Sequence, residues 1–157
     1  MNIGSWALLL LCVLHLHFGH TKQEPELTLK DMAMKATNHL KITGIPLLNG
    51  SRFYIEIGYN VANIGIHFDV RFDHEKDHHV IVINSRKEGI WSAEQRDKRF
   101  PFKQGEKFKV IINFSKNKFL VSMPGNIILS FPNRFAADKF MFIRVRGDLR
   151  IKGFDIM

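Results

Sequence analysis

The chain has 157 residues, of which 45% are hydrophobic, and its formal net charge is +8 at pH 7. This length is enough for one domain with a substantial core, and the apolar content is ordinary for a globular protein. Lys and Arg are spread along the chain and no known nucleic-acid-binding module is present, so specific nucleic-acid binding is not expected. The basic balance either suits an acidic partner, such as a sulfated or sialylated glycan or an anionic membrane surface, or serves solubility alone.

The first 20 residues differ in composition from the rest. The apolar run over 6–14 is too short to span a membrane, and polar sequence follows it from Gly19 onward. This layout is typical of a secretory signal over 1–20, which predicts a secreted, extracellular domain covering 21–157. The alternatives are an uncleaved anchor, or an N-terminal extension of a cytoplasmic protein with non-classical export. The only cysteine, Cys12, lies in this segment, so disulfides and cysteine catalysis are excluded for the mature domain.

Two N-glycosylation sequons, at Asn49 and Asn113, become relevant if the chain is secreted. The sequence around Asn49 resembles a turn, whereas Asn113 is expected on a strand. Asn49 is therefore the better candidate acceptor.

From about Leu27 onward the sequence predicts short strands separated by turn residues. Fourteen Phe against two Trp and two Tyr favour sheet interiors. The expected strands cover residues 26–30, 39–43, 52–57, 64–72, 80–84, 107–114, 118–123, 126–131, 139–146 and 149–155. The only helical signal is a turn near 133–137, and Pro124-Gly125-Asn126 indicates a tight hairpin connection. About ten evenly spaced strands predict an all-β domain, built as a two-sheet sandwich or a barrel.

One strand combines a polar face with an apolar one. Residues two apart on a strand point to the same side. The segment 67–71 therefore has a polar row opposite a core-facing row: His67, Asp69 and Arg71 against Phe68, Val70 and Phe72.

A second polar segment, about twenty residues further on, runs from Trp91 to Arg96. The flat face of Trp91 suits the C–H patch of a sugar, and Glu94 can accept hydrogen bonds from two hydroxyls. Arg96 shares a face with Glu94 and would keep it ionised. Asn84, which ends the strand before this segment, can donate and accept at once. An aromatic plate beside donors and acceptors indicates a carbohydrate-binding face.

The combination resembles the galectin signature, in which a His-x-Asn-Pro-Arg strand is followed by an Asn and a Trp-x-x-Glu-x-Arg segment. The likeness runs from about Leu27 to Met157, with matching flanks at Phe100-Pro101-Phe102 and Phe131-Pro132-Asn133-Arg134. The resemblance implies a jelly-roll β-sandwich of two antiparallel sheets that binds β-galactosides on glycoproteins or glycolipids. It implies no metal, no cofactor and no catalysis. It also makes the terminal strands candidates for pairing in a homodimer.

The resemblance assigns a role to each site residue. His67, Asp69 and Arg71 would face the axial 4-hydroxyl of galactose, Asn84 and Glu94 would hold the 6-hydroxyl, and Trp91 would stack on the ring. Arg96 would brace Glu94, and Asp77 would partner the arginines.

Asp69 is the departure from the signature that bears most on binding, because it stands where the family has Asn; the family's Pro is Val70 here. A carboxylate accepts hydrogen bonds but cannot donate one, and a lost polar partner costs about 1–3 kcal/mol. We therefore expect weakened or retuned sugar binding, strengthened by Asp69→Asn. Asp69 locking onto Arg71 is the alternative. The signal-like N-terminus is a further departure, since galectins usually leave cells without one.

Three other functions are alternatives to the lectin hypothesis. Asp69 and Glu94 could be the paired carboxylates of a glycosidase, but an Arg two residues from each would lower the carboxyl pKa, which opposes general-acid catalysis. The segment 73–79 is rich in His, Asp and Glu but lacks metal-ligand spacing, and is expected to be a flexible solvated loop. The third candidate is a galectin-related module with weakened or lost galactose binding that acts through protein or polyanion contacts.

Overall fold

The computed structural model describes residues 26–157, so the predicted signal over 1–20 lies outside the described residues. Short runs of alternating apolar and polar residues form the strands, which are joined mostly by short turns, with a ten-residue connection over 98–107. The strands are β1 (Glu26–Lys35), β2 (Leu40–Pro46), β3 (Arg52–Asn60), β4 (Asn63–His74), β5 (Asp77–Lys87), β6 (Ile90–Trp91), β7 (Gln95–Asp97), β8 (Phe108–Phe114), β9 (Lys118–Met123), β10 (Ile127–Pro132), β11 (Lys139–Gly147) and β12 (Leu149–Ile156).

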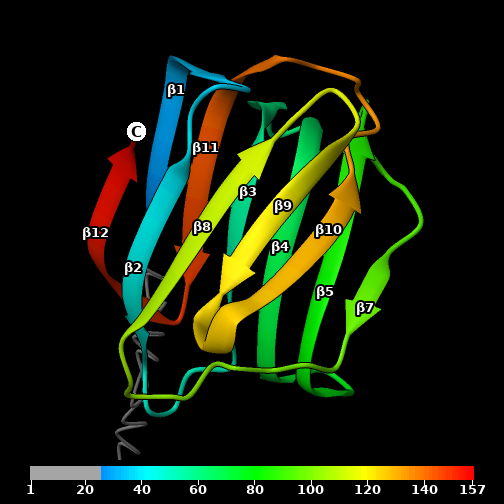
Figure 1. Ribbon diagram of the computed structural model, residues 1–157. Coiled ribbons are helices and arrows are strands. Elements are labelled where there is room, and N and C mark those ends of the chain that lie inside the picture. The colour runs from blue at the N-terminus through cyan, green and yellow to red at the C-terminus, as the bar shows by residue number, and fades with distance from the viewer. Residues whose placement is uncertain (1–25) are drawn as a thin grey trace, which may run out of the picture.

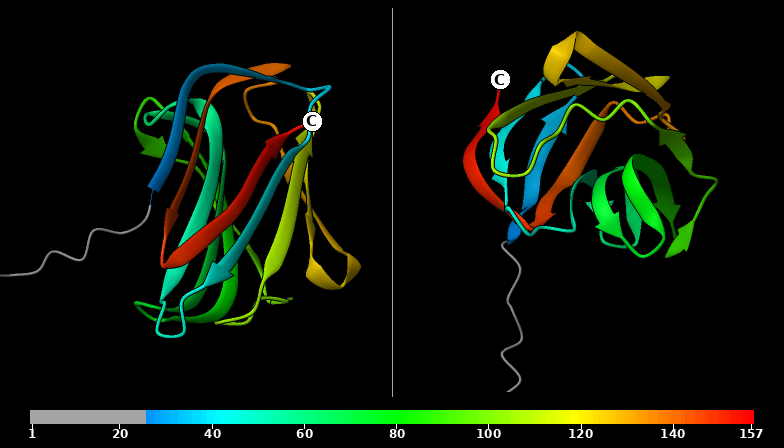
Figure 2. Two further views of the ribbon diagram at one scale, coloured as in Figure 1. Left: turned by 90° about the vertical axis from the view of Figure 1, so that its left-hand side faces the viewer. Right: turned by 90° about the horizontal axis from the view of Figure 1, so that it is seen from below.

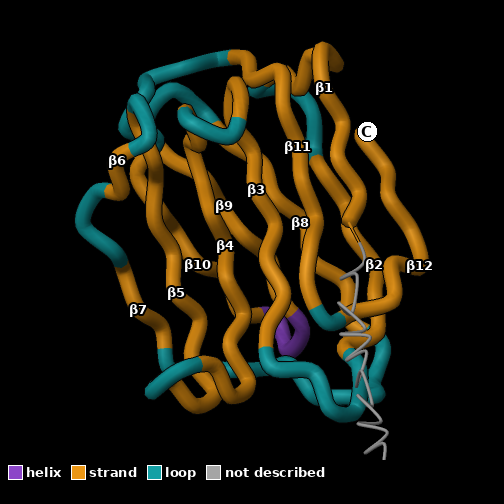
Figure 3. The backbone as a smooth tube through the Cα atoms, turned by 180° about the vertical axis from the view of Figure 1, so that it is seen from behind, coloured by secondary structure: helices purple, strands orange, loops and turns teal. Residues whose placement is uncertain are grey.

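The strands form two antiparallel sheets that face each other (Figures 1 and 2). Sheet A has the order β1-β11-β3-β4-β5-β6, and β7 pairs with the middle of β5, at Ile81–Ile83 (Figure 3). Sheet B has the order β10-β9-β8-β2-β12. The prediction of an all-β jelly-roll sandwich of two antiparallel sheets is confirmed. The terminal strands β1 and β12 each lie at the edge of a sheet, as the sequence suggested.

Phenylalanine fills the space between the sheets. Phe53 of β3 stacks on Phe108 of β8 with ring centroids 4.9 Å apart, and Phe119 of β9 stacks on Phe140 of β11 at 5.7 Å. The predicted inward row of β4 is also buried: Phe68, Val70 and Phe72. Because these side chains point inward, the alternating polar residues of β3, β4 and β11 face outward on sheet A.

The expected flexible loop over 73–79 is wrong. Strand β4 continues to His74 and β5 starts at Asp77, so only a two-residue turn separates them. Asp73 pairs with His78 in register, their side chains are 2.9 Å apart, and Glu75 takes the positive φ of 55° that the turn needs. Backbone pairing across the hairpin thus outweighs the polar composition.

Two other details bear on the sequence predictions. Strands β2 and β3 extend three residues beyond their predicted ends at Thr43 and Ile57, through Pro46 and Asn60. The sequon residue Asn49 is exposed in the turn before β3, whereas Asn113 is half-buried on β8. Over residues 26–157, no helix has the length and apolarity needed to cross a bilayer.

Candidate functional site

The outer face of sheet A carries a polar patch built from strand register. Strands β3 and β4 pair so that alternate residues lie opposite each other: Arg52 with Arg71, Tyr54 with Asp69, and Glu56 with His67. The next pairings extend the last row to Arg144 on β11 and Asn84 on β5. Residues far apart in the chain therefore meet on one surface.

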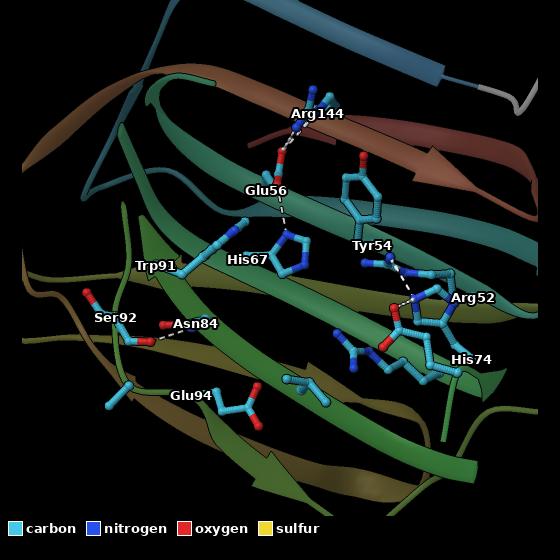
Figure 4. Close-up of a pocket in the computed structure, with 14 residues that line it drawn as sticks. Arg52, Tyr54, Glu56, His67, His74, Asn84, Trp91, Ser92, Glu94 and Arg144 are labelled. Atoms are coloured by element: carbon cyan, nitrogen blue, oxygen red, sulfur yellow. Dashed lines mark hydrogen bonds and ion pairs between the residues drawn. The ribbon is translucent and has the colours of Figure 1, made fainter. Parts of the chain in front are cut away.

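A groove of about 720 Å³ crosses this patch (Figure 4). Five of the seven residues predicted to bind sugar line it: His67, Arg71, Asn84, Trp91 and Glu94. The other two are not among the lining residues: Asp69 is buried and contacts Arg71, and Arg96 is exposed and contacts Glu94. The groove continues past the predicted residues over Arg52, Tyr54 and Glu56, none of which was predicted from the sequence to bind sugar.

Trp91 provides an apolar surface at the edge of the groove. The residue is 44% exposed, and β6 is the edge strand of sheet A among the described residues. The ring of His67 lies 4.9 Å from the indole, and the guanidinium of Arg86 lies 5.3 Å from its centroid. The indole is therefore held in place while part of its face stays open to a ligand.

Asn84 and Arg134 fix the segment that follows Trp91. The Asn84 Nδ2 donates to the backbone oxygen of Ser92 at 2.7 Å. Arg134 donates to the backbone oxygen of Ala93 and to Ser85 Oγ, both at 2.9 Å. Arg134 was named in the sequence only as part of a matching flank, because its turn lies about 40 residues beyond the segment it supports.

Glu94 is oriented through a chain of ion pairs. Arg96 Nε donates to Glu94 Oε1 at 2.6 Å, and Arg96 Nη1 donates to Asp77 Oδ1 at 2.7 Å. Arg71 Nη1 donates to the other oxygen of Asp77 at 2.6 Å. Hydrogen bonds from Arg96 and Arg71 lower the pKa of Asp77 to about 2. Asp77 thus stays ionised and ties together the two arginines, the arrangement expected from the sequence.

Asp69 is fully buried, with 0% of its surface exposed. Arg52 approaches it side-on, with Nε 3.1 Å from Oδ1 and Nη2 2.8 Å from Oδ2, and Arg71 Nε donates to Oδ2 at 2.8 Å. Burial by itself would raise the pKa of the Asp69 carboxyl, but His67, Arg52 and Arg71 outweigh burial and lower it. The carboxylate therefore lies under the groove floor as an ionised anchor, and it does not face the groove as the resemblance implied.

His67 lies between two carboxylates. Its Nδ1 is 2.7 Å from Glu56 Oε1 and its Nε2 is 3.6 Å from Asp69 Oδ2, with 8% of the residue exposed. Burial would lower the pKa of the imidazole, but hydrogen bonding and charge from Asp69 and Glu56 raise it overall. Arg144 Nε in turn donates to Glu56 Oε2 at 2.7 Å. The alternation in 52–57 and 139–146 was the only sequence signal for Glu56 and Arg144.

The geometry also bears on the competing functions. The lowered pKa of Asp69 is the reverse of what a general acid requires. Within residues 26–157, no three His, Cys, Asp or Glu side chains converge as metal ligands would, the acidic and histidine-rich hairpin included.

Comparison with known proteins identifies related folds and sequences. A family model described as galactoside-binding lectin matches residues 26–156. The galactose-binding lectin l-1 of Anguilla japonica is 33% identical over 127 residues, which cover 81% of this chain and 89% of that protein. Lactose- and MES-liganded congerin II superposes with a TM-score of 0.81 at 29% identity, covering 85% of this chain and 100% of its own. CG-16, a homodimeric agglutinin from chicken liver, superposes with a TM-score of 0.81 at 28% identity and the same coverage.

Proposed function

Since this chain belongs to the galectins, the family of galactoside-binding lectins, we propose that the groove on sheet A binds β-galactosides of glycoproteins or glycolipids. The observation that carries the proposal is that His67, Arg71, Asn84, Trp91 and Glu94 line one groove. These side chains come from three strands and the segment after β6. Their convergence supplies an aromatic plate beside a set of fixed donors and acceptors.

Each group matches a part of a galactoside. The half-exposed indole of Trp91 suits the C–H face of the sugar ring. Arg71 and a protonated His67 offer N–H donors to a hydroxyl, and Glu94, held by Arg96, accepts from a second hydroxyl. Binding of this kind needs neither metal nor catalysis, and we propose none.

We also propose that the domain of 21–157 is secreted after removal of a signal over 1–20, and that it forms a homodimer. The N-terminal composition supports secretion. The edge positions of β1 and β12 support pairing between copies, and CG-16 is a homodimeric relative. Two sites per particle would compensate for a weak single contact through avidity. N-terminal sequencing of secreted protein and sedimentation of the purified domain test these two points.

Retention on an immobilised galactoside column tests the proposed function. Wild-type protein should be retained and eluted by lactose, whereas Trp91→Ala should pass through. Ile90→Ala is the matched control, because Ile90 is the neighbouring exposed apolar residue of β6 and is not a groove residue. Wild-type protein that passes through the column would contradict the proposal. Elution only by high salt would also contradict it and would indicate polyanion binding instead.

A further inference from the structure

We propose that Arg52 is a positioning residue for the groove: it neutralises Asp69 from β3 and so keeps Arg71 available to a ligand. The inference deepens the proposed galactoside binding and rests on it. It also explains how the site accommodates a carboxylate at a position where the galectin signature has an amide.

The contacts around Asp69 show why it needs a second cation. A carboxylate with no exposed surface requires compensation by charge and hydrogen bonds. Arg52 engages both of its oxygens, through Nε at 3.1 Å and Nη2 at 2.8 Å. Arg71 supplies only Nε, at 2.8 Å. Arg52 therefore makes more hydrogen bonds to Asp69 than Arg71 does, and it reaches the carboxylate from the neighbouring strand.

This division leaves one donor of Arg71 for the groove. Arg71 uses Nε on Asp69 and Nη1 on Asp77, and no group within residues 26–157 accepts from its Nη2, which leaves that donor for a ligand. Nη2 lies on the same edge of the guanidinium as Nε. Without Arg52, that edge would close on Asp69 as a two-bond pair. The donor that faces a sugar would then be lost.

Removing the carboxylate alone would disturb the site as well. Arg52 and Arg71 lie directly opposite each other in register, and like charges so placed repel. Asp69 lies between them and cancels that repulsion. Asp69→Asn therefore weakens binding while Arg52 is present, contrary to the expectation from sequence. Replacing both residues removes the anion and its counterion together.

Lactose titration by calorimetry on Arg52→Gln, Asp69→Asn and the double variant tests this coupling. Each single variant should bind lactose at least 10-fold more weakly than wild type, and the double variant should recover to within about threefold. Arg150→Gln, an exposed arginine on sheet B, is the matched control and should bind as wild type. The proposal would be overturned if Asp69→Asn bound lactose as tightly as wild type. It would also be overturned if the fold-loss of affinity in the double variant equalled the product of the two single losses.

A measurement without sugar separates this inference from the proposed function. In NMR spectra, the chemical shift of the Arg71 Nε–H group should differ from wild type in Arg52→Gln and should be unchanged in Arg150→Gln. If wild type binds no lactose, the proposed function fails, and this resonance still reports whether Arg52 positions Arg71. An unchanged resonance in Arg52→Gln would refute the positioning role.

Discussion

Glu56 is a stringent test of the charge network under the groove. The residue is 1% exposed, and it accepts from His67 Nδ1, Arg144 Nε and Arg144 Nη2, each at 2.7 Å. Glu56→Gln preserves the shape but removes the charge that holds both cations. Breaking a buried ion pair costs about 3–5 kcal/mol. We expect the lower end, about 3 kcal/mol, because the amide oxygen keeps one acceptor, and for a domain of this size that lowers Tm by about 10 °C.

The loss should depend on pH in a defined direction. Burial lowers the pKa of His67, but Asp69 and Glu56 together raise it above the ordinary value of 6.5. A group whose pKa is raised by folding stabilises the fold fully below its unfolded pKa, and this contribution disappears as pH rises through the folded value. The difference in Tm between wild type and Glu56→Gln should therefore be largest below about pH 6.5 and should narrow as pH rises, because only the His67 contribution is lost.

Thermal unfolding followed by circular dichroism at pH 6 and pH 9 measures both effects. The matched control is Asp73→Asn, because Asp73 also contacts a histidine, at 2.9 Å, but the two side chains are 74% and 68% exposed. An exposed pair contributes about 0–1 kcal/mol. The reasoning fails if Glu56→Gln melts within 2 °C of wild type, or if the gap between them does not narrow as pH rises.

Two further changes test other parts of the structure. Asp77→Asn removes a carboxylate whose pKa is lowered to about 2 by Arg96 and Arg71. This ionised carboxylate stabilises the fold by about 1 kcal/mol after solvent screening, and the stabilisation is present above about pH 4 and lost as pH falls toward 2. The free energy of unfolding of Asp77→Asn should therefore change less than that of wild type between about pH 4 and about pH 2. Gly147→Ala should cost about 1–3 kcal/mol in chemical denaturation, because φ is +125° and the new Cβ would lie 2.6 Å from the Arg52 oxygen. Gly125→Ala, with φ +74° and open space, controls for backbone strain; equal losses in the two would contradict the steric argument.

Interactions within one strand could be predicted from the sequence. Alternation places Phe68 inside the sandwich and Arg71 on its outer face, because successive strand residues point to opposite sides. The same two-residue spacing brings Arg96 to Glu94. The galectin signature depends on such local spacing, which is why five groove residues could be named before the fold was known.

Interactions between strands required the tertiary structure. Glu56 meets Arg144, 88 residues away, only because β11 inserts between β1 and β3. The hairpin over 73–79 shows the same limit, since its polar composition favours a loop and only cross-strand pairing reveals the strands.

Asp69 marks the boundary between the two kinds of information. Its place on the groove strand follows from sequence alone. Its burial under the floor and its pairing with Arg52, 17 residues earlier, follow from the register of β3 on β4. Register depends on the packing of whole sheets, which no local sequence pattern contains. This register places Arg52 beside Asp69, so that the departure from the galectin signature is compensated by an ion pair.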